Sequence, residues 1–304
     1  MSLFNAYVTL SGAVDADISR DERMAHRTTY RIGGPASMVA VCHTYAALVK
    51  VLDVLHEEGV EWVVMGKGSN VLVSDAGFEG CVIVLGREFS RITLGDDGLV
   101  TAGAGVILSK LVTFALSNSL AGLEFACGIP GTLGGAISMD AGTRHEWIGQ
   151  RLSDVVVLRP GEGLHRYPAS EVEWGYRRTS IPTSEIVLEA TLRLEPQDKA
   201  RIASEMDQRL ARRRRTQPMG KPSCGSVFRN PGTESVAKML DECGLKGYSV
   251  GGASVSDTHA NFIVNNGDAT ARDVIAVMGH MHDEVLEKRG VDLQPEVKFL
   301  GFSS

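Results

Sequence analysis

The sequence predicts an α+β protein built from two domains, and three observations support this. The chain has 304 residues, which is more than a typical single domain needs. Up to about residue 196, short β-rich runs bounded by glycines alternate with amphipathic stretches of helical period. A long charged helical stretch then begins, and a second set of elements follows it. We therefore expect a domain border near residue 200.

The first part of the chain contains two predicted helices among several strands. Thr44 has the character of an N-cap, and an apolar stripe of helical period runs from it to Gly59. A second helix is expected over 108–119. Runs rich in β-branched residues predict strands at 61–65, 71–74, 81–85 and 153–159. Strict alternation over 186–196 predicts a half-buried strand with one apolar face, made of Ile186, Leu188, Ala190, Leu192 and Leu194.

The second part begins with a charged helix over 198–215 that ends in four arginines, 212–215. Such a run is typical of a solvated helix end, where cations suit the helix dipole; binding of a sugar nucleotide by one of these arginines remains the open alternative. Helices are predicted at 234–243 and 271–289, the latter between a Thr270–Asp273 capping box and Gly290. Strands are expected at 260–265 and 296–302.

Composition excludes several classes of protein. Lysine and arginine total 31 against 37 aspartates and glutamates, and the net charge of −6 argues against a nucleic-acid partner, because such binding depends on neutralising phosphates. No apolar run reaches the roughly 18 residues of a membrane span, and the N-terminus lacks the pattern of a signal peptide. The eight histidines lack zinc-ligand spacing, so no metal is expected. No obligate protein partner is evident.

Cysteine usage predicts a cytoplasmic protein with reduced thiols. The five cysteines are odd in number and form no CxxC pair, so they do not indicate a disulfide framework. Cys224 lies two residues before Ser226, which raises the possibility of a nucleophilic thiol. With no histidine nearby in sequence, the preferred interpretation is a small buried residue.

Glycine is over-represented and clustered. The chain has 34 glycines, against about 21 expected at the usual frequency of roughly 7%. Successive backbone N–H groups in glycine-rich loops form concave sites that suit a pyrophosphate. The P-loop and the complete G-x-G-x-x-G pattern are both absent. The sequence therefore predicts a large phosphate-bearing ligand, bound at some of the clusters "RIGGPA" (31–36), "GKGSN" (66–70), "GAG" (103–105) and "GIPGTLGG" (128–135).

Seven motifs, in the same order, resemble those of the UDP-N-acetylenolpyruvoylglucosamine reductases. Each is weak alone, but together they cover nearly the whole chain from residue 28 onward. They are "TTYRIGGPA" (28–36), "GKGSNVLVSD" (66–75), "GIPGTLGGAISMDAG" (128–142), "WGYRRTS" (174–180), "CGSVFRNP" (224–231), "GLKGYSVGGASVSDTHANFIVN" (244–265) and "QPEVKFLG" (294–301).

The resemblance implies a fold with definite borders. An FAD-binding domain of the vanillyl-alcohol-oxidase (PCMH) type, made of two lobes, would precede a C-terminal α+β substrate-binding domain. The short path from Ser180 to the strand at 186 resembles the shorter type of the family. The implied domains are an N-terminal segment 1–27, an FAD-binding domain 28–198 with lobes at about 28–85 and 86–198, and a substrate-binding domain 199–304.

The resemblance also implies an activity. NADPH would reduce FAD, and hydride would then pass to the terminal vinyl carbon of a UDP-sugar nucleotide, UDP-N-acetylglucosamine enolpyruvate. A proton would go to the carbon that bears the carboxylate, which gives UDP-N-acetylmuramate for peptidoglycan synthesis. The hydride chemistry belongs to the cofactors, and the protein places groups and supplies charge and protons.

By the same resemblance, FAD would be bound by residues of three of the motifs. The first and second motifs would contribute Arg31, Gly33, Gly34, Gly66, Lys67, Gly68, Ser69 and Asn70. The third would contribute Gly128, Ile129, Pro130, Gly131, Thr132, Gly134, Gly135, Asp140 and Gly142.

The resemblance further implies three catalytic residues. Ser226 would donate the proton, Arg177 would stabilise the developing enolate, and Glu296 would lie on the opposite side of that group. Residues expected on the substrate side are Tyr176, Arg229, Asn230, Lys246 and His259.

Without the resemblance, each catalytic candidate has a structural alternative. Ser226 would be a turn serine that caps its own backbone. Arg177 would form a surface ion pair with Glu171 or Glu173, and Glu296 would be a solvated strand end.

The sequence also departs from the family pattern. Asp140 stands where the family has an asparagine, and Thr143, Arg144 and His145 replace the expected Ala-Tyr-Gly. Thr179 replaces a serine, and the neighbouring Arg178 allows a one-residue register error at Arg177.

Two other functions remain as alternatives. Another FAD oxidase or dehydrogenase on this fold would keep the glycine loops without the set Arg177, Ser226 and Glu296. A non-catalytic flavin-binding module would lack reactive groups in its second domain.

Overall fold

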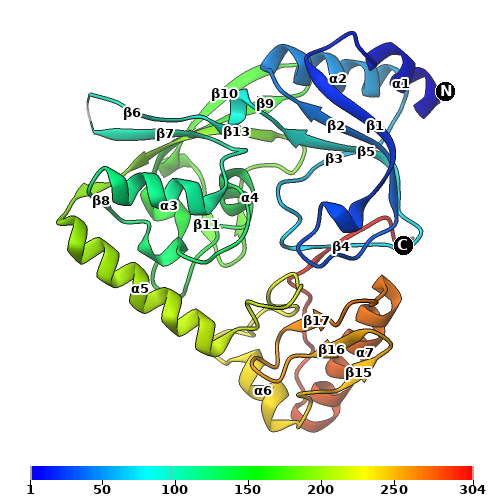
Figure 1. Ribbon diagram of the computed structural model, residues 1–304, viewed down its shortest axis with the longest axis vertical. Helices are drawn as coiled ribbons and strands as arrows, with labels where there is room; N and C mark the ends of the chain where they lie inside the picture. The colour runs from blue at the N-terminus through cyan, green and yellow to red at the C-terminus, as the bar shows by residue number, and fades with distance from the viewer. Residues whose placement is uncertain (1, 97, 303–304) are drawn as a thin grey trace. The chain divides into compact units, whose positions relative to one another are not determined.

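The computed structural model describes residues 2–96 and 98–302 (Figure 1), which pack into two compact units. Unit 1 contains the described residues of Met1–Arg20, Met38–Gly66 and Gly80–Ala211, and unit 2 those of Asp21–Ser37, Lys67–Glu79 and Arg212–Ser304. Compact packing does not test which segments fold as domains. The domain borders given above for 1–27, 28–198 and 199–304 therefore stay a prediction.

The first sheet of unit 1 has the strand order β1-β2-β5-β3, and α1 and α2 pack against it (Figure 1). Helix α2 begins where the sequence predicts, because Thr44 Oγ1 accepts the N–H of Ala47 at 3.2 Å. The predicted strands at 61–65 and 81–85 are confirmed as β3 and β5, which run parallel. The bounds are α1 (Leu3–Leu10), β1 (Ala16–Arg23), β2 (Pro35–Cys42), α2 (Tyr45–Glu57), β3 (Trp62–Val64) and β5 (Phe78–Leu85).

The second sheet of unit 1 is antiparallel, with the order β10-β9-β13-β7-β6. Its apolar face shares a core with helices α3 and α4. The predicted helix at 108–119 is confirmed as α3, and the predicted strand at 153–159 as β9. The bounds are β6 (Ile92–Leu94), β7 (Leu99–Gly103), α3 (Leu108–Ser117), α4 (Leu133–Ser138), β9 (Leu152–Arg159), β10 (Gly163–Pro168) and β13 (Ile186–Arg193).

Strand β13 corrects the prediction of one apolar face over 186–196. Its pairing with β9 shifts register between Val187 and Glu189, which marks a β-bulge or similar irregularity. An extra residue at such a point changes the face to which the following side chains point. The five apolar residues accordingly pack in two clusters, Ile186 and Leu188 in one, and Ala190, Leu192 and Leu194 in the other.

Unit 1 also contains two short strand pairs and most of a long charged helix. Strand β8 (Leu120–Ala121) pairs with β14 (Glu195–Pro196), and β11 (Trp174–Gly175) pairs with β12 (Arg178–Thr179). Helix α5 spans Lys199–Thr216, which confirms the charged helix predicted over 198–215.

Unit 2 has a small antiparallel sheet, β15-β16-β17, whose apolar side chains share a core with α6 and α7. Helix α7 has the predicted capping box between Thr270 and Asp273, and Gly290 ends it at φ +65°. Strand β4 (Val71–Val73), predicted at 71–74, pairs in parallel with β18 (Lys298–Leu300). The other bounds are α6 (Val236–Glu242), β15 (Ser249–Val250), β16 (Ala253–Val255), β17 (Ile263–Asn265) and α7 (Ala271–Arg289).

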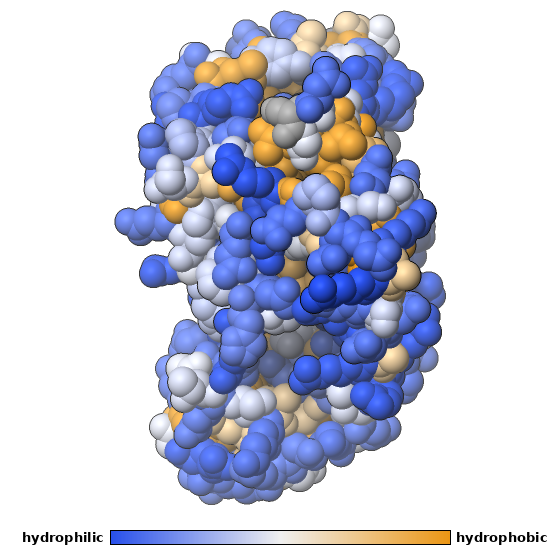
Figure 2. Space-filling view, turned by 90° about the vertical axis from the view of Figure 1, so that its left-hand side faces the viewer, coloured by the Kyte–Doolittle hydropathy of each residue, from blue (hydrophilic) through white to orange (hydrophobic). Residues whose placement is uncertain are grey.

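One face of the molecule is largely polar. Figure 2 shows one face of the molecule, on which hydrophilic residues predominate around smaller apolar areas. Within 2–96 and 98–302, none of the helices combines the length and the apolar character that a membrane crossing requires.

Candidate active site

Ser226 lies in an extended segment of unit 2. It forms a single antiparallel bridge with Phe262, and the next residue but one, Phe228, forms another with Pro295. Among the described residues, the Ser226 hydroxyl has no hydrogen-bond partner and is half-buried. Ser226 is therefore not a turn serine that caps its own backbone, and its hydroxyl is available to donate a proton.

Glu296 lies on the segment next to that of Ser226. Its backbone N–H donates to the carbonyl of Val227 at 2.8 Å, and its own carbonyl accepts from Asn70 Nδ2 at 3.2 Å. Only 7% of Glu296 is exposed, so it is not a solvated strand end. A carboxylate is costly to bury unless it is stabilised, so a buried glutamate on the segment next to that of Ser226 is an unusual feature. The structure thus brings two of the three catalytic candidates together.

Cys224 precedes Ser226 but is not a reactive thiol. Its side chain is 2% exposed, and burial raises the pKa of the thiol to about 12. A thiol is nucleophilic only as the thiolate, so Cys224 is protonated at neutral pH. The interpretation as a buried small residue is confirmed.

Arg229 and Asn230 continue the same segment. The backbone N–H of Arg229 donates to the carbonyl of Gln294 at 2.8 Å, while its side-chain Nε is buried without a hydrogen-bond partner among the described residues. A buried unpaired donor is rare and is a candidate contact for a bound anion. Asn230 Oδ1 accepts the N–H of Val236 at 2.9 Å, so this side chain also holds the first residue of α6.

Lys246 and His259 interact electrostatically in unit 2. The pKa of His259 is lowered, first by burial and then by the charge of Lys246. His259 Nδ1 accepts the N–H of Asn261 at 3.3 Å, so the neutral ring carries its proton on Nε2. Lys246 itself contacts Asp241 Oδ2 at 2.9 Å. The pair therefore offers one ammonium group and one neutral N–H donor.

Arg177 lies in unit 1 at the turn between β11 and β12. It has φ +60°, in the left-handed region, and its guanidinium carbon lies 5.1 Å from the centre of the Tyr176 ring. Tyr176 is 50% exposed. Arg177 Nη1 donates to the carbonyl of Gly142 at 3.5 Å. The structure therefore brings Arg177 to the loop that the sequence assigns to the flavin.

Two of the predicted glycine loops meet in unit 1. A Cβ atom on Gly66 would lie 2.5 Å from Thr132 Oγ1, and one on Gly134 would lie 2.9 Å from the Cβ of Ala104. Gly128 and Gly131 have φ +77° and +131°, which side chains rarely adopt. Thr132 Oγ1 accepts the N–H of Gly135 at 3.4 Å at the start of α4. Close packing therefore requires glycine at positions 66 and 134, whereas the loop that contains Gly128 and Gly131 is of the glycine-rich kind that suits close approach of a phosphate-bearing cofactor such as FAD.

The remaining glycines of the predicted cofactor set lie in unit 2. Gly33 and Gly68 have φ +136° and +58°. A Cβ atom on Gly34 would lie 2.2 Å from the carbonyl oxygen of Asp75, and one on Gly68 would lie 2.6 Å from that of Arg27. Close backbone packing already requires glycine at both positions. Arg31, with φ +55°, lies in the same unit, as do Lys67, Ser69 and Asn70.

The cluster "GAG" at 103–105 has a structural cause. A Cβ atom on Gly103 would lie 2.2 Å from the carbonyl oxygen of Phe89, and one on Gly105 would lie 2.8 Å from that of Leu85. Neither position tolerates a side chain without movement of the backbone. Packing within unit 1 therefore accounts for this cluster without any ligand.

Asp140 is buried in the loop that is predicted to bind the flavin, and its side chain makes a structural contact. Its φ is +40°, a conformation that aspartate and asparagine tolerate better than most residues. Its Oδ1 accepts the N–H of Gly149 at 3.1 Å, and only 5% of the residue is exposed. Burial raises the pKa of Asp140 to about 6, against the opposing effects of the Gly149 N–H and the charge of Arg177. Aspartate in place of the family asparagine thus keeps an oxygen that accepts the Gly149 N–H, and it adds a group that can ionise.

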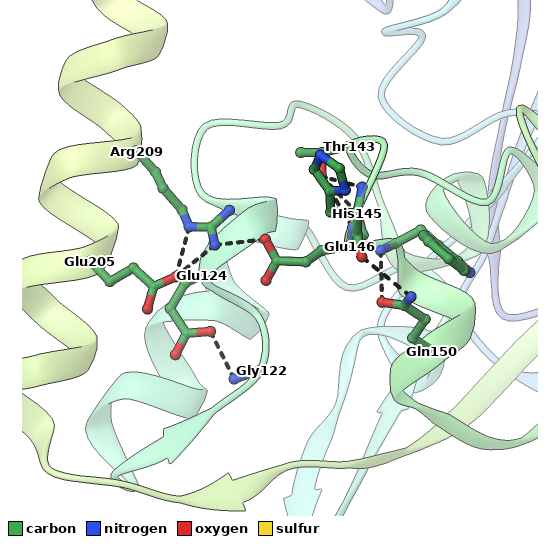
Figure 3. A network of polar contacts seen from close by, with 9 residues as sticks. Gly122, Glu124, Thr143, His145, Glu146, Gln150, Glu205 and Arg209 are labelled. Atoms are coloured by element: carbon green, nitrogen blue, oxygen red, sulfur yellow. Dashed lines mark hydrogen bonds and ion pairs between the residues drawn. The ribbon is translucent and has the colours of Figure 1, made fainter. Parts of the chain in front are cut away.

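The second departure, Thr143 to His145, forms a tight turn (Figure 3). Thr143 N–H donates to the carbonyl of Glu146 at 2.7 Å, and Thr143 Oγ1 accepts the N–H of Glu146 at 3.1 Å. Arg209 of α5 reaches Glu146 Oε2 and Glu205 Oε1, both at 2.6 Å. In place of the Ala-Tyr-Gly of the family, this chain has a turn in which the Thr143 hydroxyl accepts a backbone N–H. The ion pair between Glu146 and Arg209 connects this turn to α5.

Replacing Asp140 by asparagine is expected to stabilise the protein above pH 6. A folded pKa of about 6 against the ordinary 3.8 means that the folded state keeps its proton longer than the unfolded state does. The stability that this group contributes is therefore lost as the pH rises from about 4 to about 6. The carboxamide of the variant keeps the acceptor for Gly149 and has no charge to bury, so it avoids a cost of up to about 3 kcal/mol.

Thermal unfolding at pH 4.5 and pH 8 measures this effect. The melting temperature of Asp140→Asn should exceed that of the parent at pH 8, and the difference should shrink at pH 4.5. Asp53→Asn, at an exposed position on α2, is the matched control. A difference that is the same at both pH values would show that ionisation of Asp140 does not affect stability.

Comparison with known proteins finds two family models that match this chain. Residues 36–159 match the model of the FAD binding domain, and residues 217–300 match that of the UDP-N-acetylenolpyruvoylglucosamine reductase C-terminal domain. These matches, together with the solved structure described next, confirm the expected fold class, an FAD-binding domain of the vanillyl-alcohol-oxidase type followed by a C-terminal α+β domain.

Whole-length relatives agree with the two domain matches. A UDP-N-acetylenolpyruvoylglucosamine reductase of Heliobacterium modesticaldum is 42% identical over 286 residues, covering 93% of this chain and 91% of the relative. One from Symbiobacterium thermophilum is 41% identical over 285 residues, covering 93% and 92%. The crystal structure of the enzyme from Thermus caldophilus superposes with a TM-score of 0.83 at 34% identity, covering 94% of this chain and 99% of that one. The chain therefore belongs to the UDP-N-acetylenolpyruvoylglucosamine reductase family.

Proposed function

We propose that the protein reduces UDP-N-acetylglucosamine enolpyruvate to UDP-N-acetylmuramate, with FAD as its cofactor and NADPH as the reductant. The observation that carries the assignment of residues is the arrangement in unit 2. There a serine hydroxyl without a partner among the described residues lies on the segment paired with that of a buried glutamate. Ser226 and Glu296 each lie in a motif that resembles one of this family.

FAD, when bound, supplies the hydride that it has received from NADPH. In unit 1 the residues proposed to hold it belong to the loop from Gly128 to Gly142 and include Gly66. In unit 2 the proposed residues are Arg31, Gly33, Gly34 and the run from Lys67 to Asn70. The match of residues 36–159 to the FAD binding domain supports the assignment of the residues from Gly66 to Asn70 and from Gly128 to Gly142.

Ser226 is the proposed proton donor. Once hydride has reached the vinyl carbon, the neighbouring carbon is conjugated to a carboxylate and is basic enough to take a proton from a held hydroxyl. The O–H bond of Ser226 breaks as the new C–H bond forms, and water returns a proton to the serine. The absence of a competing partner for Oγ within the described chain supports this role.

Charged side chains would bind the rest of the substrate. Arg177 presents a planar guanidinium that suits a carboxylate, and stabilising the enolate is an interaction that strengthens in the transition state. The unpartnered Nε of Arg229 and the ammonium of Lys246 suit the anionic diphosphate. Glu296 is proposed to act on the reacting carbon from beside Ser226, while His259, Asn230 and Tyr176 contribute neutral polar contacts.

A cytoplasmic location is part of the proposal. None of the five cysteines, all of which lie within the described residues, forms a disulfide, as expected in a reducing compartment. The proposed reductant and sugar nucleotide are also polar, diffusible molecules. The proposed partner is accordingly a UDP-sugar nucleotide rather than a nucleic acid, a membrane or another protein.

Anaerobic spectroscopy tests the function directly. The purified protein should show a flavin absorption band that NADPH bleaches, and addition of UDP-N-acetylglucosamine enolpyruvate should restore the band. UDP-N-acetylglucosamine, which lacks the enolpyruvyl group, is the control and should not restore it. A bleached band that ignores the enolpyruvyl substrate would indicate another oxidoreductase of this fold. Absence of any flavin band would contradict the cofactor assignment.

A further inference from the structure

Asn261 holds the segment of Ser226 with its side chain. Its Oδ1 accepts the N–H of Phe228 at 3.1 Å, and its Nδ2 donates to the carbonyl of the same residue at 2.8 Å. Only 3% of Asn261 is exposed. One carboxamide thus satisfies both backbone groups of Phe228, as a neighbouring strand would do.

The backbone of Asn261 adds to the same arrangement. Its carbonyl accepts the N–H of Val227 at 3.0 Å, and its N–H donates to His259 Nδ1 at 3.3 Å. On the other side of the segment, the N–H of Glu296 donates to the carbonyl of Val227. The two residues that follow Ser226 are therefore fixed on both sides, and Asn261 also orients the His259 ring.

Asn261 lies just before β17, outside its regular pairing with β16. The sequence predicts a strand over 260–265, whereas β17 spans only Ile263–Asn265. At Asn261 the side chain, rather than a regular ladder of backbone groups, supplies the bonds to Phe228. Buried amide groups of this kind are costly to leave unpaired, so replacement of Asn261 frees two buried backbone groups at once.

We propose that Asn261 is a positioning residue for proton donation, because its carboxamide fixes the direction of the Ser226 hydroxyl through Phe228. The inference rests on the proposed role of Ser226. Proton transfer from a hydroxyl requires hydrogen-bond geometry to the accepting carbon. A small displacement of the segment should therefore slow that step more than any other. Reduction by NADPH does not need the hydroxyl and should be spared.

Two variants test the two hydrogen bonds that the Asn261 side chain makes with the backbone of Phe228. Asn261→Asp keeps the acceptor for the Phe228 N–H but puts a carboxylate oxygen against the Phe228 carbonyl. Asn261→Leu has the same branching and the same number of side-chain heavy atoms, and it makes neither bond. The matched control is Asn265→Leu, because Asn265 is 5% exposed and donates to the carbonyl of Tyr30 at 3.0 Å. Its side chain also accepts the N–H groups of Gly267 and Ala269, away from residues 226–229.

The experiment is anaerobic stopped-flow kinetics on the FAD-loaded enzyme, at a temperature where thermal unfolding shows every variant to be folded. For both Asn261 variants, reoxidation by the enolpyruvyl substrate should slow by about 10- to 100-fold, while reduction by NADPH stays within about twofold of the parent. The solvent deuterium isotope effect on reoxidation should increase, because proton transfer becomes rate-limiting. For Asn265→Leu, both half-reactions and the isotope effect should match the parent.

Hydrogen exchange provides a readout that does not depend on activity. The amides of Val227 and Phe228 should exchange faster in both Asn261 variants, whereas Asn265→Leu should leave their protection unchanged. If Asn261→Leu fails to fold, Asn261→Asp carries the test alone.

The outcomes distinguish failure of this inference from failure of the proposed function. Unchanged reoxidation in the Asn261 variants, with Ser226→Ala strongly impaired, would overturn the inference and leave the role of Ser226 intact. Equal loss in both half-reactions with an unchanged isotope effect would also overturn it, since the asparagine would then be only structural. Unimpaired reoxidation in Ser226→Ala would refute the proposed role of the serine itself.

Discussion

Ser226→Ala is expected to slow reoxidation by UDP-N-acetylglucosamine enolpyruvate by about 10²- to 10⁴-fold, the usual contribution of a general acid. Reduction by NADPH should stay close to that of the parent, because no proton from the serine is needed there. Since the hydroxyl has no partner among the described residues, its removal breaks no hydrogen bond and should leave the melting temperature nearly unchanged. The two half-reactions are measured separately by stopped-flow absorbance of the flavin.

Ser249→Ala is the control for this experiment, because Ser249 is exposed on β15 in the same unit. It should behave as the parent in both half-reactions. Equal loss of both half-reactions in Ser226→Ala would indicate a structural serine. No loss in either would remove Ser226 from the reaction and leave the proton source to another group.

Glu296→Gln is expected to lower the rate of reoxidation by about 10²-fold or more while it preserves stability. The backbone bonds of residue 296 to Val227 and Asn70 do not involve the carboxylate and persist in the variant. Glutamine also has nearly the same size as glutamate and keeps one acceptor oxygen, so the melting temperature should stay close to that of the parent. Loss of activity together with retained stability is the expected signature, measured by stopped-flow kinetics and thermal unfolding.

A matched control exists in the other unit. Glu124 is 6% exposed, and its Oε2 accepts the N–H of Gly122 at 2.8 Å (Figure 3). Glu124→Gln should leave reoxidation unchanged. Parent-like reoxidation in Glu296→Gln would exclude Glu296 from the reaction, whereas a large fall in melting temperature would indicate that its carboxylate is mainly structural.

Local signals in the sequence were sufficient for most helices and strands. The capping box of α7 and the cap at Thr44 each depend on residues three positions apart, so their geometry is set within one turn. The two apolar faces of β13 were not predictable in the same way. Its register shift arises from pairing with β9, and alternation along one strand does not reveal how its neighbour is spaced.

For the candidate site, the motifs identified the chemistry but not the supporting contacts. The sequence singled out Ser226 and Glu296, and the structure places them on paired segments. Asn261 was not singled out, although an asparagine inside an apolar run was the available signal. Its partner Phe228 lies 33 residues away, and no local pattern indicates which backbone a buried amide will hold. Asp140 likewise stood out only as a departure from the family asparagine, and the sequence did not indicate that its carboxyl accepts the N–H of Gly149.

The parallel pairing of β4 with β18 has a consequence for synthesis of the protein. Asn70, next to β4, contacts the carbonyl of Glu296 across 226 residues of sequence, and Lys298 N–H donates to the carbonyl of Asn70 at 3.0 Å. Contacts so distant along the chain form late, because the intervening loop must close first. During translation, β4 therefore has to wait as an unpaired edge until residues 298–300 have left the ribosome. Maturation of unit 2, and with it the segment that carries Glu296, therefore requires synthesis at least as far as residue 300.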